Sequence, residues 1–182
     1  MNKKKDTIIK LKIFKAPLIS KTNYFMWLKD KEVIKYLYRQ ELFLGIKKKQ
    51  IYKYVNDLDK SKNDFFYLII VDKKIIGTVK LGHVDWYAKT GDIGIMIGDK
   101  NYWGKGYATR IIKIISKISK KKFKLRKLIA GTPGNNIGMI KAFKKNNFKV
   151  EGIRKKHLLI SRKYVDHILF GNILGISVED LI

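Results

Sequence analysis

The sequence contains no cysteine and only two prolines among its 182 residues. Without cysteine the chain can form neither a disulfide framework, nor a thiolate nucleophile, nor a cysteine-bearing zinc site. Acidic residues are also scarce, with 15 Asp and Glu against 41 Lys and Arg. The longest hydrophobic run covers only residues 65–71, far short of the ~20 residues that cross a bilayer. Lysines interrupt the hydrophobic stretch after the basic start, which excludes an export signal. We therefore expect a soluble, cytoplasmic protein without membrane insertion.

The excess of basic residues gives a formal net charge of +26 at pH 7. Only five of the basic residues are arginines, whereas proteins that read nucleic acids favour arginine for forked contacts to phosphate and guanine. The lysines are spread along the whole chain, which is typical of a solvated surface. Two explanations of the net charge stay open: an enrichment in lysine that has no function, and electrostatic steering of a polyanionic ligand. A nucleic-acid partner is disfavoured.

Hydrophobic periodicity predicts one mixed α+β domain over residues 1–182, because no linker or repeat divides the chain. Short turns between the strands of its first half indicate an antiparallel meander. The expected elements are a strand at 7–14, helices at 24–29, 30–37 and 51–58, strands at 65–71, 75–84 and 92–98, a helix at 107–122, a strand at 127–132, a helix at 136–146, and strands at 148–159 and 163–169.

The segment with the clearest functional signal is Gly104-Lys105-Gly106, which opens an amphipathic helix. Glycines let a ligand approach the backbone closely, and the first N–H groups of a helix attract anions. The segment therefore predicts a phosphate-binding loop, although an ordinary loop explains the motif alone equally well. It matches neither the P-loop nor the dinucleotide-binding fingerprint. The hydrophobic face of the helix that follows is expected to contain Ile111, Ile114, Ile115 and Ile118.

In its wider context this segment resembles a known family. Residues 102–109, Tyr-Trp-Gly-Lys-Gly-Tyr-Ala-Thr, resemble the acyl-CoA pyrophosphate loop of the GNAT superfamily of N-acetyltransferases, especially its RimJ/RimL-like branch. A second block from Asn136 to Gly152 is similar to that branch's Asn-x-x-Ser…Lys-x-Gly-Phe…Glu-Gly signature. The resemblance implies the GNAT fold, a mixed and mostly antiparallel twisted sheet of about seven strands with flanking helices and a splayed central parallel pair.

The resemblance also implies acetyl-CoA as co-substrate, without a metal. The pantetheine arm would pair with a strand on one side of the splayed pair, and the pyrophosphate would bind the loop amides. Lys105 and Lys145 could add charge near the phosphates, but ordinary solvated lysines are an equal alternative. The residues assigned to acetyl-CoA are Ile95, Met96, Ile97, Trp103, Gly104, Lys105, Gly106, Tyr107, Ala108, Thr109, Asn136, Phe143 and Lys145.

The sequence departs from the family pattern at two informative positions. Phe143 stands where many GNAT enzymes place a tyrosine that protonates the departing thiolate. Either the thiolate leaves unaided, since thiols have a pKa of only about 8.5, or another group donates the proton. Asn147 replaces the glycine before Phe148, a mild change because asparagine tolerates a left-handed backbone. The identity of the general acid therefore stays open.

Amine acetylation needs a neutral amine, so a base near the acceptor is expected. Asp92 corresponds to the position where the family often has a glutamate base, and we predict that it acts directly or through water. A simple turn residue is the alternative. His83 would lie near Asp92 across a hairpin and titrates in the right range, although a lone histidine is more often structural. Candidate acceptor residues, each also explicable as ordinary surface, are Asp85, Trp86, Tyr87 and Asp166.

The sequence thus predicts an acetyl-CoA-dependent N-acetyltransferase that acts on a small-molecule primary amine. An amino sugar on a nucleotide carrier is favoured, because the sequence is most similar to RimJ/RimL-type members that use such substrates. The alternatives are a protein N-terminal acetyltransferase and a catalytically impaired basic module that binds nucleic acid or acyl-CoA. Polyamines are disfavoured, because a basic protein repels a polycation unless it has a local acidic pocket. GNAT homodimers are common, but the sequence leaves the oligomeric state open.

Overall fold

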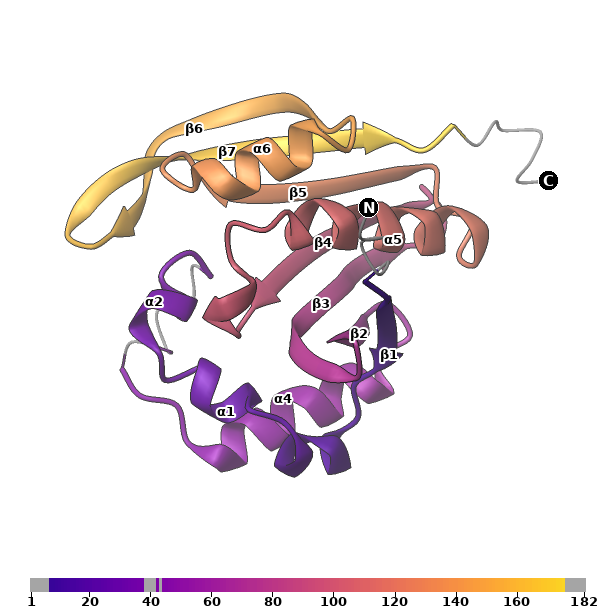
Figure 1. Ribbon diagram of the computed structural model, residues 1–182. Coiled ribbons are helices and arrows are strands. Elements are labelled where there is room, and N and C mark those ends of the chain that lie inside the picture. Colours follow the sequence, from indigo (N-terminus) through magenta and orange to yellow (C-terminus); the bar gives the residue numbers. More distant parts are fainter. Residues whose placement is uncertain (1–6, 38–41, 43, 176–182) are drawn as a thin grey trace, which may run out of the picture.

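The computed structural model describes residues 7–37, 42 and 44–175. Seven strands form one mixed sheet in the order β1-β2-β3-β4-β5-β7-β6 (Figure 1). Only the β4–β5 neighbours are parallel, and all other neighbours are antiparallel. This sheet confirms the predicted fold class. The strands are β1 (Ile9–Ile13), β2 (Phe65–Val71), β3 (Lys74–Asp85), β4 (Thr90–Ile97), β5 (Lys127–Pro133), β6 (Lys149–Ile160) and β7 (Lys163–Ile173).

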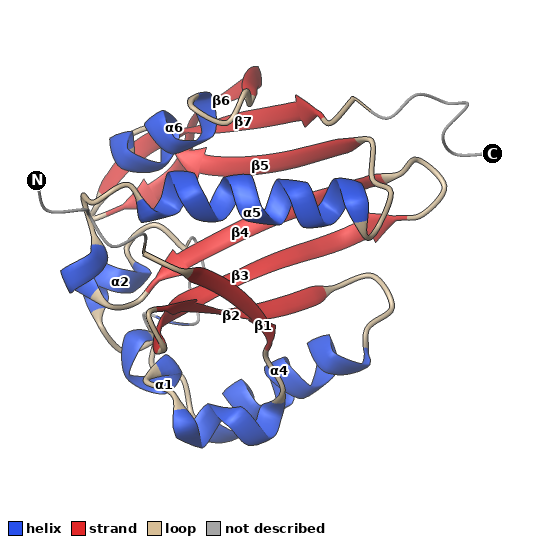
Figure 2. Ribbon diagram, turned by 45° about the vertical axis from the view of Figure 1, so that its right-hand side comes forward, coloured by secondary structure: helices blue, strands red, loops and turns tan. Residues whose placement is uncertain are grey.

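Helices cover both faces of the sheet, and Figure 2 shows α5 lying across one of them. Helices α5 and α6 pack on this face, whereas the helices before β2 pack on the opposite face. No helix among the described residues is long and hydrophobic enough to span a bilayer. The helices are η1 (Ala16–Lys21), α1 (Tyr24–Trp27), α2 (Lys31–Ile34), α4 (Lys48–Lys60), η2 (Lys100–Tyr102), α5 (Tyr107–Lys121) and α6 (Ile137–Lys144).

The buried face of α5 shares two of its four positions with the predicted one, because Ile112 and Ser119 take the places expected for Ile114 and Ile118. Ile111 and Ile115 are fully buried as expected, but the third fully buried isoleucine is Ile112, and Ile114 is only half-buried. Ser119 is also fully buried, so the centre of the contact stripe runs along positions 111, 112, 115 and 119. The sequence could not fix this rotation, because isoleucines at 114 and 118 offered an equally good periodic stripe.

On the opposite face an aromatic cluster holds the N-terminal segments against the sheet. The ring of Phe14 contacts Tyr24 edge-on at a centroid distance of 5.2 Å and lies 5.3 Å from the ring of Phe66. Trp27 joins the same buried cluster and lies against Gly98 at the end of β4. These contacts place α1 and α2 beside the end of β4 that leads into the glycine-rich loop.

Several local signals in the sequence act as predicted. The Asp30 side chain accepts a hydrogen bond of 2.9 Å from the Glu32 N–H and so caps α2. Asn147 adopts a left-handed backbone with φ of 64° before Phe148, as expected for asparagine in place of glycine. One boundary differs from the prediction: helix α1 ends at Trp27, whereas the sequence predicted a helix to residue 29.

The central feature of the sheet is the separation of β4 from β5. Their pairing covers only Thr90↔Lys127, Gly91↔Leu128 and Asp92↔Ile129. Both strands continue well beyond the last of these pairs, each held by its other neighbour, β4 by β3 and β5 by β7. A gap therefore opens between two firmly held strands immediately after Asp92, which confirms the splayed parallel pair.

Candidate active site

The edge of β4 that faces the gap carries backbone groups without a partner in β5. The Gly98 N–H donates to Ile76 O on the β3 side at 2.8 Å. Because successive residues of a strand point their backbone groups to opposite edges, those of Ile93, Ile95 and Ile97 point toward the gap. The Ile97 carbonyl accepts a 2.7 Å hydrogen bond from Trp103 Nε1. The Ile93 N–H hydrogen-bonds the Asp92 carboxylate, so the Ile93 carbonyl and the backbone groups of Ile95 are left to pair with an extended ligand.

This alternation changes the set of strand residues assigned to the cofactor. Met96 turns its backbone groups toward β3, and its side chain is buried in the cluster on the side of α1 and α4. Met96 is therefore a core residue of the structure. Ile93, which the sequence analysis omitted, has its backbone carbonyl in the gap. The period of two along a strand would have identified it once the partner strands were known.

The glycine-rich loop lies at the open end of the gap, where the Trp103 indole ties it to β4. Gly104 and Gly106 have φ angles of +70° and +77°, and nothing lies within 4 Å of the position of a Cβ at either residue. Gly106 immediately precedes α5. The first N–H groups of α5 have no acceptor within the helix and carry the positive end of its dipole. The loop is therefore shaped to hold an anionic group.

The remaining residues predicted to contact the cofactor have mixed surroundings. The Asn136 side chain caps α6 by accepting a hydrogen bond from the Met139 N–H at 3.3 Å. Lys105 and Lys145 are exposed on the surface. Phe143 is 2% exposed and packs with its ring 5.1 Å from that of Phe148. Phe143 thus has a structural role in the core, and its predicted contact with the cofactor stays a prediction.

Asp92 occupies the last paired position before the gap, and His83 lies beside it. The His83 Nδ1 is 4.0 Å from Asp92 Oδ2, as the sequence predicted for two residues across the β3–β4 hairpin. Burial raises the pKa of the Asp92 carboxyl above its usual value, against the opposing charges of His83 and Lys80. A carboxylate with a raised pKa is a stronger base and is suited to accept a proton.

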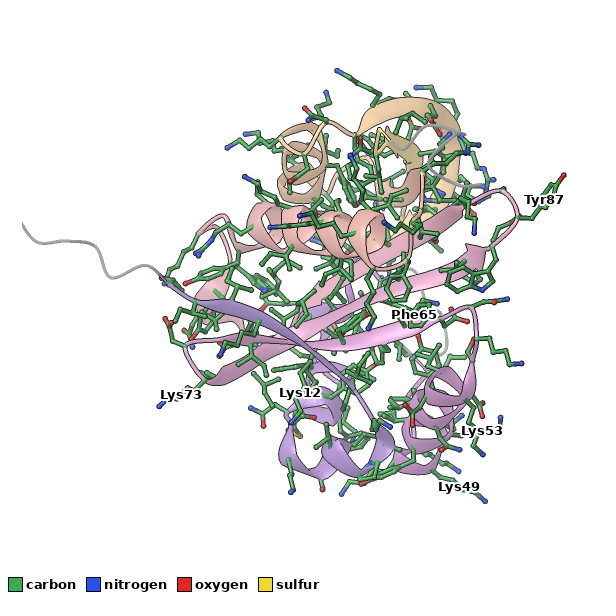
Figure 3. All side chains as sticks on the ribbon, turned by 90° about the vertical axis from the view of Figure 1, so that its right-hand side faces the viewer. Lys12, Lys49, Lys53, Phe65, Lys73 and Tyr87 are labelled. Atoms are coloured by element: carbon green, nitrogen blue, oxygen red, sulfur yellow. The ribbon has the colours of Figure 1, made fainter. Side chains whose placement is uncertain are left out.

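The candidate acceptor residues do not come together. Asp85 organises the β3–β4 turn by accepting hydrogen bonds from the N–H groups of Tyr87 and Ala88. Tyr87 is fully exposed and points away from the molecule (Figure 3). Asp166 lies at the other end of β5, where its carbonyl accepts from Gly134 N–H. Six residue steps along β5, ~20 Å of strand, separate the two ends.

Two of these residues also have structural partners. Trp86 Nε1 donates a 2.9 Å hydrogen bond to Asn63 Oδ1, and the Asp166 carboxylate lies 2.9 Å from Lys155 Nζ. Among the described residues, no group of three or more His, Asp or Glu side chains is arranged to hold a metal ion.

Comparison with known proteins identifies the family. The acetyltransferase (GNAT) domain family matches residues 17–149. A probable N-acetyltransferase of Bacillus subtilis (strain 168), YjcK, is 30% identical over 122 residues, which cover 66% of this chain and 67% of the relative. Spermidine N-acetyltransferase from Vibrio cholerae, solved with CoA and spermine, superposes with a TM-score of 0.82 at 15% identity and covers 92% of this chain and 96% of its own.

A ribosomal-protein-S5-alanine acetyltransferase from Vibrio fischeri superposes with a TM-score of 0.71 at 24% identity, covering 92% of this chain and 93% of its own. The parted strands and the glycine-opened helix fit the extended, phosphate-bearing donor of such enzymes. The chain belongs to the GNAT family of acetyltransferases and is an N-acetyltransferase that uses acetyl-CoA.

Proposed function

We propose that this enzyme acetylates the primary amine of a nucleotide-linked amino sugar, with Asp92 as the base. The observation that carries the proposal is the position of Asp92, whose pair with Ile129 is the last before β4 and β5 separate. A ligand that enters the gap from the loop reaches its inner end beside this carboxylate.

The loop and β4 divide the binding of acetyl-CoA between them. The backbone amides from Trp103 to Thr109 would hold the pyrophosphate at the start of α5. The Ile93 carbonyl and the backbone groups of Ile95 would pair with the pantetheine arm, and the Ile95 N–H would donate to the thioester carbonyl oxygen. When bound, acetyl-CoA supplies the activated acetyl group.

Asp92 would prepare the acceptor by removing a proton from its ammonium form, directly or through a water molecule. Its raised pKa, caused by burial, brings the carboxyl closer to the pH at which the amine is acetylated, which improves a general base. His83, 4.0 Å away, is placed to pass this proton on to solvent, because its side chain is largely exposed. Asp92 therefore has the central chemical role and His83 a supporting one.

The charges around the gap favour a neutral or anionic acceptor over a polyamine. Asp64 lies 3.4 Å from Lys80, and Glu151 lies 2.7 Å from Lys127. Both acids are thus paired with cations of the chain, on the same side of the sheet as Asp92. A polycation would have to displace these lysines, whereas the diphosphate of a nucleotide sugar would be attracted by the net charge of +26.

A protein N-terminus is the second candidate acceptor. The ribosomal-protein-S5-alanine acetyltransferase that superposes on the chain supports this candidate. An N-terminal amine must also be in its neutral form before it can be acetylated. A basic enzyme would also be attracted to a ribosome.

Two experiments test the proposal in sequence. Calorimetry with CoA and acetyl-CoA should first detect binding to the purified protein, and no affinity for either would refute the role of the gap and loop. Release of free CoA thiol is then followed with UDP- and dTDP-linked amino sugars, with N-terminal peptides and with spermidine. We expect the highest kcat/KM with an amino sugar. Turnover of peptides alone would favour the second candidate, and turnover of spermidine alone would refute both.

A further inference from the structure

Asp64 lies in the turn between α4 and β2, and its carboxylate joins this turn to the end of β3. Its Oδ1 accepts a 3.3 Å hydrogen bond from the backbone N–H of His83 and lies 3.4 Å from Lys80 Nζ. Its Oδ2 accepts a 2.8 Å hydrogen bond from Ser61 Oγ. Burial opposes the charged form, but the Ser61 hydrogen bond and the Lys80 charge outweigh it and lower the pKa of Asp64. Asp64 is therefore an anion at neutral pH.

The hydrogen bond to His83 holds an irregular piece of backbone. The register between β3 and β4 shifts between Gly82 and Asp85, and His83 adopts a left-handed backbone with φ of 50°. This conformation is strained for a non-glycine residue, so it persists where surrounding contacts stabilise it. The bulge orients the imidazole of His83 toward Asp92, at 4.0 Å.

The second partner of Asp64, Lys80, lies over Gly82. A Cβ on Gly82 would be 2.8 Å from Asp64 Oδ1 and 2.9 Å from Lys80 Nζ, so the ion pair occupies the space that a side chain at position 82 would need. Gly82 is the cross-strand partner of Asp92, and opposed Cβ positions are ~5 Å apart. The Lys80 ammonium and the Asp92 carboxylate are therefore neighbours across the β3–β4 pair.

We propose that Asp64 is a positioning residue for Asp92: it fixes the bulge that presents His83 and holds the Lys80 ammonium over Gly82. The inference rests on the proposed function only in treating Asp92 as the base. Asp64 itself does not touch the gap. Its effect reaches Asp92 through the two groups that it holds.

The charged groups that face Asp92 come from three sides. Strand β3 contributes Lys80 and His83, and the α4–β2 turn contributes Asp64. Strand β5 contributes Lys127, which Glu151 of β6 pairs at 2.7 Å. Lys80 and His83 favour the charged form of Asp92 and so lower its pKa against the larger effect of burial. Loss of the Lys80 charge should therefore raise the pKa of Asp92, and loss of the Asp64 carboxylate should raise it to a smaller extent, because Lys80 is then no longer held beside Asp92.

The test follows the carboxyl carbon of Asp92 by NMR titration of protein labelled with 13C at aspartate, assigned by its absence in Asp92→Asn. We expect both variants to move the midpoint up, Lys80→Met by about half a pH unit and Asp64→Asn by less. Asparagine still accepts the hydrogen bond from His83, so the bulge is retained. Lys53→Met is the matched control, because Lys53 pairs with Asp57 at 2.7 Å on α4 (Figure 3), and it should leave the midpoint unchanged.

The acid limb of the kcat/KM profile should move in the same direction as the midpoint in both variants. A midpoint that stays fixed in Lys80→Met, or that stays fixed or moves down in Asp64→Asn, overturns the inference. If Asp64→Asn does not fold, Lys80→Met decides alone, and an unmoved midpoint refutes the proposal. Upward shifts of Asp92 in both variants of a protein that acetylates no amine would instead support the positioning by Asp64 and refute the proposed function.

Discussion

The imidazole of His83 lies 4.0 Å from the carboxylate of Asp92, at the point where β4 separates from β5. The backbone of Ile93 holds the Asp92 carboxylate, and a backbone bulge in β3 presents His83 to it. The last pair between β4 and β5 contains Asp92. The proposed base is therefore placed where the sheet begins to open for the cofactor.

Asp92→Asn should lower kcat/KM by about 10²–10⁴-fold, the usual contribution of a general base. It should also raise the melting temperature at pH 7. Burial raises the pKa of Asp92 in the folded state. Its protonated form therefore stabilises the fold at any pH below the usual pKa of aspartate, and this stability is lost as the pH rises through the raised pKa of the folded state. Asparagine cannot ionise, so the Asp92→Asn variant does not lose this stability at pH 7.

Thermal melts at pH 3 and pH 7, with initial rates at several pH values, test this prediction. Asp57→Asn, on the surface of α4, is the control and should change neither rate nor the pH dependence of stability. Unchanged turnover with an unchanged pH profile in Asp92→Asn would exclude Asp92 from the mechanism.

Gly106→Ala should weaken CoA binding more than it destabilises the fold. The left-handed backbone at Gly106, with φ of +77°, costs an alanine about 1–2 kcal/mol, and relief of this strain would turn the first amides of α5 away from the pyrophosphate. Calorimetry should show a Kd for CoA that is about 10-fold higher. Gly45→Ala is the control, since Gly45 has a φ of +92° and an equally open environment. It should cost similar stability and leave the Kd unchanged, and equal losses of affinity in both variants would contradict the prediction.

Elements with a strong local pattern could be predicted from the sequence, whereas pairings between distant segments could not. The hydrophobic run of β2 ends at a turn, and its predicted bounds, Phe65–Val71, are the observed ones. The glycine-rich loop before α5 was also located, although the motif alone left an ordinary loop as an equal alternative. By contrast, Asp85 and Asp166 were both assigned to an acceptor pocket, although the register of β5 places them at opposite ends of the sheet. No local pattern encodes that register.

The candidate site was predicted only where its residues are close in the sequence. Asp92 and His83 are joined by a short hairpin, so their proximity follows from counting residues along two strands. Asp64 and Lys80 meet only because the α4–β2 turn folds against β3 over a glycine, and neither residue is unusual in the sequence. Which residues of β4 turn their backbone toward the gap, Ile93 rather than Met96, could likewise be decided only once the partner strands were known.

Gly98→Ala should destabilise the protein by about 1–3 kcal/mol, the usual cost of overpacking a core. A Cβ on Gly98 would overlap the indole of Trp27, which is itself buried and cannot retreat without opening the cluster around Phe14 and Phe66. Gly94→Ala is the matched control on β4, where nothing lies within 4 Å of the added Cβ. Urea unfolding should show a lower midpoint for Gly98→Ala and an equal or higher one for Gly94→Ala. Equal midpoints for the two variants would show that Trp27 does not pack as described.

Tyr67→Phe should stabilise the protein, because the Tyr67 hydroxyl is buried without a hydrogen-bond partner among the described residues. Loss of such an unsatisfied group recovers a desolvation penalty of about 1–3 kcal/mol. Burial raises the pKa of Tyr67 to about 12, so folding disfavours its phenolate, and the wild type should lose stability as the pH rises from 10 toward 12. Urea unfolding at pH 7 and pH 11 should therefore show a larger advantage for Tyr67→Phe at the higher pH. Tyr87→Phe, at a fully exposed tyrosine, should have no effect at either pH, and an advantage for Tyr67→Phe that shrinks with rising pH would contradict the assignment.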